Sequence, residues 1–494
     1  MPQGAPFLTI LPKSERILLG CFSAAALVLR ALAFFRYRFD SDEQQHLHVA
    51  WGWTRGLVQY RDVFDNHLPL FHLLTAPLVA LVGERADVLL WMRLPMLLLF
   101  GVVIWATYVL ADDLRVGRWA VVLLALFPPF FLKSLEYRND NLWTALWMLA
   151  MVGVVRRWRP FVIGLLLGGA LMVSIKTVVL LVAFVVALRK QKWMEMLAGF
   201  AVIPALLTIY FASIGALDDL LYCNVTFNSH FAMTRKGLWV LRLLFPLLLG
   251  LILWLARRYR PHFFAVLIAV YAITLVSAGA PVSPRDFLPL MPLAAILLAT
   301  SVTQTRAFAA IAIVFIAALF YYADRFENNT DWHITMMHQV LGLSRPGESL
   351  LDVKGETIFR RRPFYYVFEN LTRMQMAHGI IRDTVAEDVI RTRTHVVQAD
   401  GPMWPPRARA FLSENFLDMG RLRASGQWLT SDGSFTIAVP GEYLFVDEYG
   451  PLTRPRVFAA GAHRFMPVRR LTAVVWATAI RRGYSPFNLR DREF

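Results

Sequence analysis

Long apolar runs separated by short polar segments fill the first two thirds of the chain. A helix needs roughly 20 mostly apolar residues to cross a lipid bilayer, so we predict an all-α membrane domain of about eleven spanning helices. The predicted spans are residues 16–35, 89–111, 119–135, 141–155, 161–173, 177–188, 194–216, 237–256, 263–280, 287–302 and 307–322.

The charge between these runs predicts their direction. Clusters of Lys and Arg mark cytoplasmic loops, and the clusters here all fall on that side only if the apolar run 68–83 lies at the outer surface without spanning. The same solution folds residues 161–188 into a hairpin of two short spans around Ser174-Ile175-Lys176. One long tilted helix is the alternative, but it leaves a basic cluster outside. We therefore expect the N-terminus inside and the C-terminal segment outside.

Charge, proline and glycine return after residue 323. Compact or alternating apolar runs predict strands at 350–353, 395–398, 435–439, 443–446 and 473–480. Helical periodicity predicts helices at 374–391 and 407–416. The chain therefore divides into a membrane domain, residues 1–323 with a first outer loop at 36–88, and a small extracytoplasmic α/β domain, residues 324–494.

Composition agrees with a membrane protein. The chain is 57% hydrophobic and 17% charged, against about 45–50% and 25% in soluble domains. Its net charge of +16 would suggest a nucleic-acid partner in a soluble protein. Here the basic clusters lie between apolar runs, which indicates membrane topology and contact with anionic lipids, so no nucleic-acid partner is expected. Two cysteines make no disulfide framework or metal site.

The predicted topology places the unusual polar residues on the outer face. Ionisable groups at membrane depth cost about 2.5–3.5 kcal/mol each, so they pair or line a wet cavity. Carboxylates together with Arg and Lys on one face are typical of an anion-binding reaction site. The candidates are Asp42, Glu43, His46, Tyr60, Arg61, Asp62, His67, Arg138, Asp140, Lys176 and Arg285. Each also has a plain structural interpretation, such as a solvated helix cap, a local ion pair or a lysine reaching lipid headgroups.

A divalent cation is a further candidate. Carboxylate oxygens of Asp42, Glu43 or Asp140 suit Mg²⁺ or Mn²⁺, and Asp42 with Asp140 is the tentative ligand pair. His46 and His48 fit ordinary loop histidines better than metal ligands.

The order of these motifs resembles that of the GT-C fold glycosyltransferases, in particular the bacterial protein-O-mannosyltransferase-like and aminoarabinose-transferase-like membrane enzymes. The resemblance covers about the first 320 residues, and the tail is similar to the variable outer domain of some members. The resemblance rests on five features. Three lie in the first two outer loops: an Asp-Glu pair, a Tyr-Arg-Asp…His-x-Pro-Leu segment and an Arg-x-Asp motif. The other two are a Lys in a short hairpin and a late Arg before the Pro-rich run 287–292.

The resemblance implies a hexosyl- or pentosyltransferase of the bacterial inner membrane. Such an enzyme moves a sugar from a polyprenyl-phosphate donor to a lipid, glycan or protein acceptor outside the cytoplasm. Asp42 then matches the general base and Glu43 its neighbour, while Arg138, Lys176 and Arg285 match donor-phosphate ligands. Asp140, His46, Tyr60, Arg61, Asp62 and His67 would bind or support substrate. Many relatives have Lys-Pro-Pro where this chain has His67-Leu68-Pro69, which leaves donor preference open.

The expected chemistry is a single displacement with inversion at the anomeric carbon. A positioned carboxylate base typically contributes about 10²–10⁴-fold to such a step, and fixed cations stabilise the phosphate that leaves. The alternative function is a transporter or flippase for lipid-linked or anionic solutes, although the chain lacks the repeated broken helices common in transporters. A non-catalytic scaffold is a third interpretation.

Overall fold

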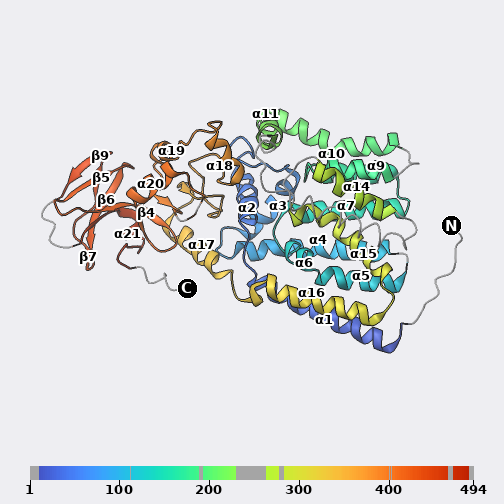
Figure 1. Cartoon of the computed structure of the whole chain (residues 1–494). Coiled ribbons are helices and arrows are strands. Elements are labelled where there is room, and N and C mark those ends of the chain that lie inside the picture. The colour runs from blue at the N-terminus through green and yellow to red at the C-terminus, as the bar shows by residue number, and fades with distance from the viewer. Residues whose placement is uncertain are drawn as a thin grey trace.

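The membrane-type helices and the strands occupy opposite ends of an elongated molecule (Figure 1). The computed structural model describes residues 11–111, 113–187, 193–229, 263–277, 283–399, 401, 403–465 and 471–488. Helices of the first 322 residues pack side by side, and the sheet lies at the end of the molecule away from the N-terminus.

Ten of the eleven predicted spans coincide with helices, and span 237–256 lies outside the described residues. The helices are α1 (Lys13–Arg36), α2 (Ser41–Thr54), α3 (Leu70–Val82), α4 (Val88–Leu110), α5 (Leu114–Leu126), α6 (Pro128–Lys133), α7 (Asn139–Val155), α8 (Pro160–Leu171), α9 (Thr177–Ala187), α10 (Trp193–Ser213), α11 (Leu217–Leu221), α12 (Phe227–Ser229), α14 (Phe263–Ser277), α15 (Met291–Ser301) and α16 (Thr305–Tyr322). A π-helix, Tyr222–Thr226, joins α11 to α12, and a 3-10 helix, Pro284–Leu290, precedes α15.

Two predicted spans are not continuous α-helices. Span 119–135 is divided between α5 and α6, because Pro128 follows Phe127, whose extended backbone ends α5. Span 287–302 starts in the 3-10 helix, with Pro289 inside it and Pro292 in the first turn of α15. Both breaks lie near the polar end of the bundle, where they shape loops without interrupting the apolar centre.

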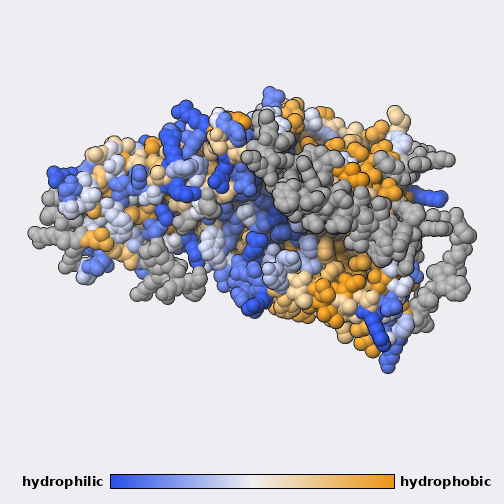
Figure 2. Space-filling view, viewed as in Figure 1, coloured by the Kyte–Doolittle hydropathy of each residue, from blue (hydrophilic) through white to orange (hydrophobic). Residues whose placement is uncertain are grey.

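The surface of the bundle is apolar, as an integral membrane protein requires (Figure 2). Among the described residues, four helices are long and apolar enough to cross a membrane: α1, α4, α10 and α16. Large side chains such as Leu98 and Leu27 are 75% and 69% exposed on them. Such an exposed apolar surface is favourable only against lipid or another apolar partner.

Residues 161–188 form the predicted hairpin. Helix α8 ends at Leu171 and α9 begins at Thr177. Helices α8 and α10 then run in the same direction, since Gly164 meets Met196 and Gly168 meets Phe200. A Cβ at Gly164 would lie 1.9 Å from the Met196 carbonyl oxygen, so glycine is what permits this close backbone approach. The single-helix alternative is wrong.

Helix α3 begins and ends at the polar end of the bundle, as expected of the run 68–83. Its first amide, Leu70 N, donates to Met172 O at the tip of the hairpin (3.1 Å). Just after its last turn, Glu84 accepts from Arg55 (2.5 Å) and from Arg360 of the tail (2.9 Å). Because both ends lie on one side, α3 does not cross the bundle.

Basic loops gather at the opposite end. Arg115, at the start of α5, pairs with Glu15 at the start of α1 (2.7 Å) and donates to Thr303 O before α16 (3.0 Å). The chain reverses across each span, so the cluster Arg156-Arg157 after α7 lies at this end as well. The separation of basic loops from the mixed-charge end matches the pattern that the sequence predicted.

The chain after α16 contains helices and a mixed sheet. Its helices are α17 (Asp331–Leu343), α18 (Asn370–Ala377), α19 (Val385–Arg391), α20 (Pro406–Asn415) and α21 (Ala477–Arg481). Its strands are β1 (Leu350–Leu351), β2 (Val396–Val397), β3 (Phe416–Asp418), β4 (Arg423–Trp428), β5 (Ser434–Ile437), β6 (Gly441–Asp447), β7 (Gly450–Pro451), β8 (Arg456–Phe458), β9 (Gly461–Arg464) and β10 (Ala473–Trp476). The main sheet has the order β1-β2-β4-β10-β6-β7; β3 pairs with β4, β8 pairs with β6, and β5 pairs with β9 in a second sheet.

The tail differs from the sequence prediction in several details, and helix α17 and strands β3, β7, β8 and β9 are among the elements that were not predicted. The helix predicted at 374–391 is two helices, α18 and α19, because Gly379 has a φ of +72°. The strand predicted at 473–480 ends at Trp476 and continues as α21. Strand β4, which pairs with β2, β3 and β10, was not predicted, since RASGQW lacks a clear apolar alternation.

Candidate functional site

The site begins at the first turn of α2. Asp40 is the N-cap: its carboxylate accepts from Asp42 N (3.1 Å), and Glu43 accepts from Asp40 N (3.0 Å), which completes a capping box. The cap holds Asp40 and Asp42 on one end of the helix, where the helix dipole favours negative charge. Both side chains are largely buried, with 14% and 16% exposed.

Three cations from three distant segments converge on Asp42. Arg138, just before α7, and Lys354, in the loop after β1, both form ion pairs with its carboxylate. Arg285, in the 3-10 helix before α15, lies 3.2 Å from Asp42 and 2.5 Å from Asp40. The structure thus brings together Asp42, Arg138 and Arg285, which the sequence analysis expected on one face.

The cluster continues on both sides of these residues. Arg138 also bonds Asp40 (3.2 Å) and Asp140 (3.1 Å). Lys133 bonds Glu136 (2.5 Å), and Arg285 lies 3.5 Å from Glu136. We call the set Asp40, Asp42, Lys133, Glu136, Arg138, Asp140, Arg285 and Lys354 the charge cluster.

Lys176 lies at the edge of this cluster. Its ammonium pairs with Asp286, the neighbour of Arg285, and its side chain is 38% exposed. Its charge is close enough to act on Asp140. The structure therefore places Lys176 beside the site, as expected, with its ammonium held by Asp286 rather than by Asp42.

The pKa values of Asp42 and Glu136, the two acidic groups at the centre, are shifted in opposite directions. Burial alone would raise the pKa of Asp42, but the charges of Arg138, Lys354 and Arg285 outweigh it and hold that pKa well below the usual range. Glu136 is fully buried, and burial raises its pKa to about 7 despite the charge of Lys133. Asp42 is therefore ionised at neutral pH, whereas Glu136 is close to half protonated.

Glu43 does not have the catalytic position expected of it. Its carboxylate is fully buried and bonds Arg93 of α4 twice, at 2.8 and 3.1 Å. It also accepts from Tyr137 N (2.8 Å) in the second polar loop. With its oxygens engaged by Arg93, Tyr137 N and Asp40 N, Glu43 holds α2, α4 and that loop together. The assignment as a catalytic residue is corrected to a positioning one.

His46 and His67 belong to a buried hydrogen-bonded group behind the cluster. His46 bonds His72 (2.8 Å), and His67 bonds Asp65 (2.8 Å). The rings of His46 and His67 lie 4.6 Å apart. Burial, with the neighbouring His67 and His72, lowers the pKa of His46 well below its usual value, so the ring is neutral. Both residues therefore support the site from behind.

Tyr60, Arg61 and Asp62 lie apart from the charge cluster. The Tyr60 hydroxyl donates to His67 O (2.7 Å), and its φ of +76° marks a strained turn. Arg61 bonds Ile214 O (3.2 Å) and Asp62 (3.1 Å). The structure therefore places this triplet outside the charge cluster, and its expected role in binding or supporting substrate stays a prediction.

The charge cluster does not fit a divalent cation well. The guanidinium of Arg138 lies between Asp42 and Asp140, the tentative ligand pair, and bonds both carboxylates. The described residues also contain no group of three or more His, Cys, Asp or Glu side chains in metal-binding arrangement. A divalent cation at this pair stays a prediction, and Arg138 would have to leave both carboxylates for it to bind.

Several residues of the site were missed by the sequence analysis. Asp40 and Glu136 stand within the motifs that it quoted, and Arg93 is a lone charge in an apolar run, which by itself signals a buried partner. Lys354 gave no such signal. It comes from the tail, 312 positions after its partner Asp42, and only the folded chain brings the two together.

Two comparisons with known proteins found similarities to this chain. Residues 68–233, which include Arg138 and Lys176, match the model of glycosyltransferase family 87. No curated protein matches the chain in sequence. Two solved structures of ArnT from Cupriavidus metallidurans, one in the apo state and one bound to undecaprenyl phosphate, share its fold. Each superposes with a TM-score of 0.53 at 15% identity and covers 84% of this chain and 98% of the ArnT chain. Residues 68–233 therefore resemble glycosyltransferase family 87, and the chain shares the fold of the membrane protein ArnT.

Proposed function

We propose that the chain transfers a sugar from a polyprenyl-phosphate donor to an acceptor hydroxyl, with Asp42 as the general base. The observation that carries this proposal is the convergence of Arg138, Arg285 and Lys354 on Asp42. Support also comes from ArnT, which has the same fold and was solved with undecaprenyl phosphate.

The donor phosphate competes with Asp42 for its cations. The donor phosphate is a diester with one negative charge, and its two unesterified oxygens match the guanidinium fork, so Arg138 and Arg285 can turn from carboxylate to phosphate. The ammonium groups of Lys354 and Lys176 add positive charge, and they do not require a fixed orientation of the phosphate. Because these cations hold the pKa of Asp42 down, their transfer to phosphate raises that pKa. Donor binding therefore releases Asp42 and makes it a stronger base.

The reaction follows from this exchange. The acceptor oxygen attacks the anomeric carbon from the face opposite the phosphate, and the bond from that carbon to the phosphate oxygen breaks. The electron pair of that bond leaves with the lipid phosphate, and Asp42 takes the hydroxyl proton. The configuration inverts. Arg138, Arg285 and Lys354 stabilise the charge that grows on the leaving phosphate, which in a partly dry site is worth far more than in water.

The membrane geometry suits a lipid-linked donor. Helix α3 lies at the polar end with Leu74 and Leu81 exposed (55% and 83%) and Phe71 and Val79 buried (1% and 2%). A helix with one buried face and one exposed apolar face rests in the membrane interface. Positive charge marks the other end of the bundle as cytoplasmic. We infer that the charge cluster and the tail face the periplasm of a bacterial inner membrane, where the polyprenyl tail remains in the bilayer.

Asp42→Asn is the direct test. The amide keeps the size of the side chain but accepts no proton, so we expect transfer to fall about 10²–10⁴-fold. The assay uses the purified full chain with a radiolabelled polyprenyl-phosphate sugar and a membrane extract as acceptor. Asp432→Asn, in an exposed turn of the tail, is the matched control and keeps normal turnover. Near-normal transfer by Asp42→Asn would falsify the base assignment.

A further inference from the structure

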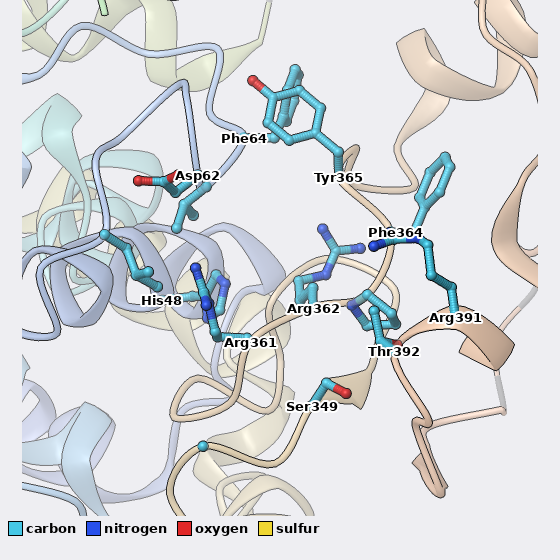
Figure 3. Close-up of a pocket in the computed structure, with 14 residues that line it drawn as sticks. His48, Asp62, Phe64, Ser349, Arg361, Arg362, Phe364, Tyr365, Arg391 and Thr392 are labelled. Carbon is cyan, nitrogen blue, oxygen red and sulfur yellow. The ribbon is translucent and has the colours of Figure 1, made fainter. Parts of the chain in front are cut away.

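A second pocket lies between the first polar loop and the tail, apart from the charge cluster (Figure 3). Its volume is about 370 Å³, which lies within the range of small-molecule sites. The two sites have no residue in common. The pocket is lined among others by His48, Asp62, Phe64, Arg361, Arg362 and Tyr365.

The pocket has an excess of positive charge. Arg361, Arg362 and Arg391 line it against one carboxylate, Asp62. The guanidinium groups of Arg361 and Arg362 point toward the side on which Asp62 and Tyr365 lie (Figure 3). Such an excess inside a cavity attracts an anion.

The three arginines differ in the bonds that their side chains already form within the protein. Arg362 bonds the buried carboxylate of Asp352 (2.7 Å), and Arg391 bonds Asp388 (2.8 Å). Arg361 forms no side-chain hydrogen bond or close ion pair with any described residue. The carboxylate of Asp62 is itself engaged by Val58 N (2.9 Å) and by Arg61 (3.1 Å). Arg361 is therefore the cation most open to a ligand.

The remaining lining adds the features of a sugar site. Phe64 and Phe364 line the pocket and are packed against other aromatic side chains, which fixes this side of the pocket as apolar. Ser349 and Thr392 add hydroxyl groups for hydrogen bonds. A cationic group beside aromatic rings and hydroxyls fits a ligand that is both anionic and rich in hydroxyls.

We propose that this pocket binds a phosphate-bearing sugar headgroup of the acceptor, with Arg361 as the principal phosphate ligand. The inference rests on the proposed function, because it names the second substrate of that reaction. Helix α2 connects the two sites: His48 lines the pocket, and Asp42 begins the helix six residues earlier. At 1.5 Å per residue the two positions are about 9 Å apart along the axis. A headgroup held in the pocket can thus extend a hydroxyl toward Asp42.

One loop joins the pocket to the charge cluster. Asp352, which Arg362 holds, accepts hydrogen bonds from Gly355 N (2.8 Å) and Thr357 N (2.9 Å). These bonds shape the turn that presents Lys354 to Asp42. Arg362, in the wall of the pocket, is therefore bonded to the turn that carries Lys354.

Binding to the full chain in lipid nanodiscs tests the proposal. The probes are glucose 6-phosphate, uncharged glucose, and nanodiscs that carry phosphatidic acid. We expect glucose 6-phosphate or phosphatidic acid to bind and glucose not to bind, and Arg361→Gln to weaken binding roughly tenfold or more. Binding of only one of the two probes identifies a soluble glycan phosphate or a lipid headgroup as the source. Arg481→Gln removes the same charge from an exposed pair with Glu442 (2.6 Å) and is the matched control.

Two further variants separate this proposal from the proposed function. Asp42→Asn keeps probe binding while it loses transfer. If Arg285→Gln abolishes probe binding and Arg361→Gln leaves it unchanged, the anion binds at the charge cluster and the pocket proposal is overturned, although the transferase proposal stands. Equal binding of glucose and glucose 6-phosphate overturns the phosphate assignment as well.

Discussion

At the scale of single residues, neighbours in sequence have separate tasks. Asp42 faces three cations, whereas Glu43 turns into the protein toward Arg93. Successive side chains of a helix point about 100° apart, so an Asp-Glu pair cannot place both carboxylates in one site. The sequence motif correctly marked the segment, and the helix geometry separated the functional side chain from the structural one.

Glu43→Gln is predicted to destabilise the fold. The variant leaves Arg93 buried with no counter-charge, which costs about 3–5 kcal/mol for a pair in which both side chains are 0% exposed. Thermal unfolding of the purified protein in detergent measures the loss. The double variant Glu43→Gln, Arg93→Met removes both charges and should recover part of it. Additive losses in the double variant would contradict a direct pair.

The raised pKa of Glu136 predicts that the stability of the protein depends on pH. Its pKa is raised to about 7 in the folded state from 4.5, so between these values the folded protein binds more protons than the unfolded chain. Stability therefore falls as pH rises from about 4.5 to about 7. Glu356 of the tail, with a pKa also raised to about 7 by burial, contributes in the same direction.

Melting temperature against pH checks this sign. Glu136→Gln should flatten the slope, and Glu136→Gln with Glu356→Gln should flatten it further. A slope that is unchanged in both variants would show that neither carboxyl takes up a proton on folding.

At the scale of elements, glycines determine how the hairpin packs. Helices α8 and α10 touch backbone to backbone, with Gly164, Gly168 and Gly199 at the contact. Small residues at such positions are a general device of membrane helices, because lipid-exposed helices gain stability from close packing. The sequence shows these glycines, but only the packed helices show that each meets the backbone of the other helix, α8 against α10.

Gly164→Ala is predicted to separate these helices. The added Cβ would lie 1.9 Å from Met196 O, a backbone atom that cannot rotate away. We expect a loss of about 1–3 kcal/mol, measured by thermal unfolding. Gly20→Ala in α1, where nothing lies within 4 Å of the new Cβ, is the control and should leave stability unchanged or slightly higher. Equal melting temperatures for the two variants would contradict the close contact.

At the scale of the whole molecule, the tail contributes to the charge cluster. Lys354 reaches Asp42 from the loop after β1, and Glu369, near the start of α18, bonds Asn66 of the first polar loop (3.1 Å). Arg360 of the same region bonds Glu84 after α3 (2.9 Å). These contacts attach the tail to the polar end of the bundle on several sides.

Lys354→Met is predicted to weaken donor binding more than folding. Loss of one cation near the phosphate should raise the KM for the donor roughly tenfold and leave the melting temperature near normal. Steady-state kinetics with the polyprenyl-phosphate sugar measure the change, and Arg481→Gln again controls for the lost charge. An unchanged KM would place the donor phosphate away from the tail.

The sequence by itself determined the membrane class, the order of the spans, the hairpin and the face that carries the charges. These properties follow from local composition: apolar length, positive loops and helix-breaking residues act within a few positions of one another. It also supplied Asp42, Arg138, Lys176 and Arg285, since a charge beside a membrane span is conspicuous wherever it occurs.

Only the tertiary structure decided which of these charges meet. Lys354 and Arg93 gain their roles from partners far away in the chain, Glu43 loses a catalytic role to burial, and Arg361 remains open because its neighbours are already paired. Electrostatic energy depends on the distance between charges and on the water that the fold excludes. Both the distances and the excluded water depend on how the helices pack, so the sequence alone does not give them.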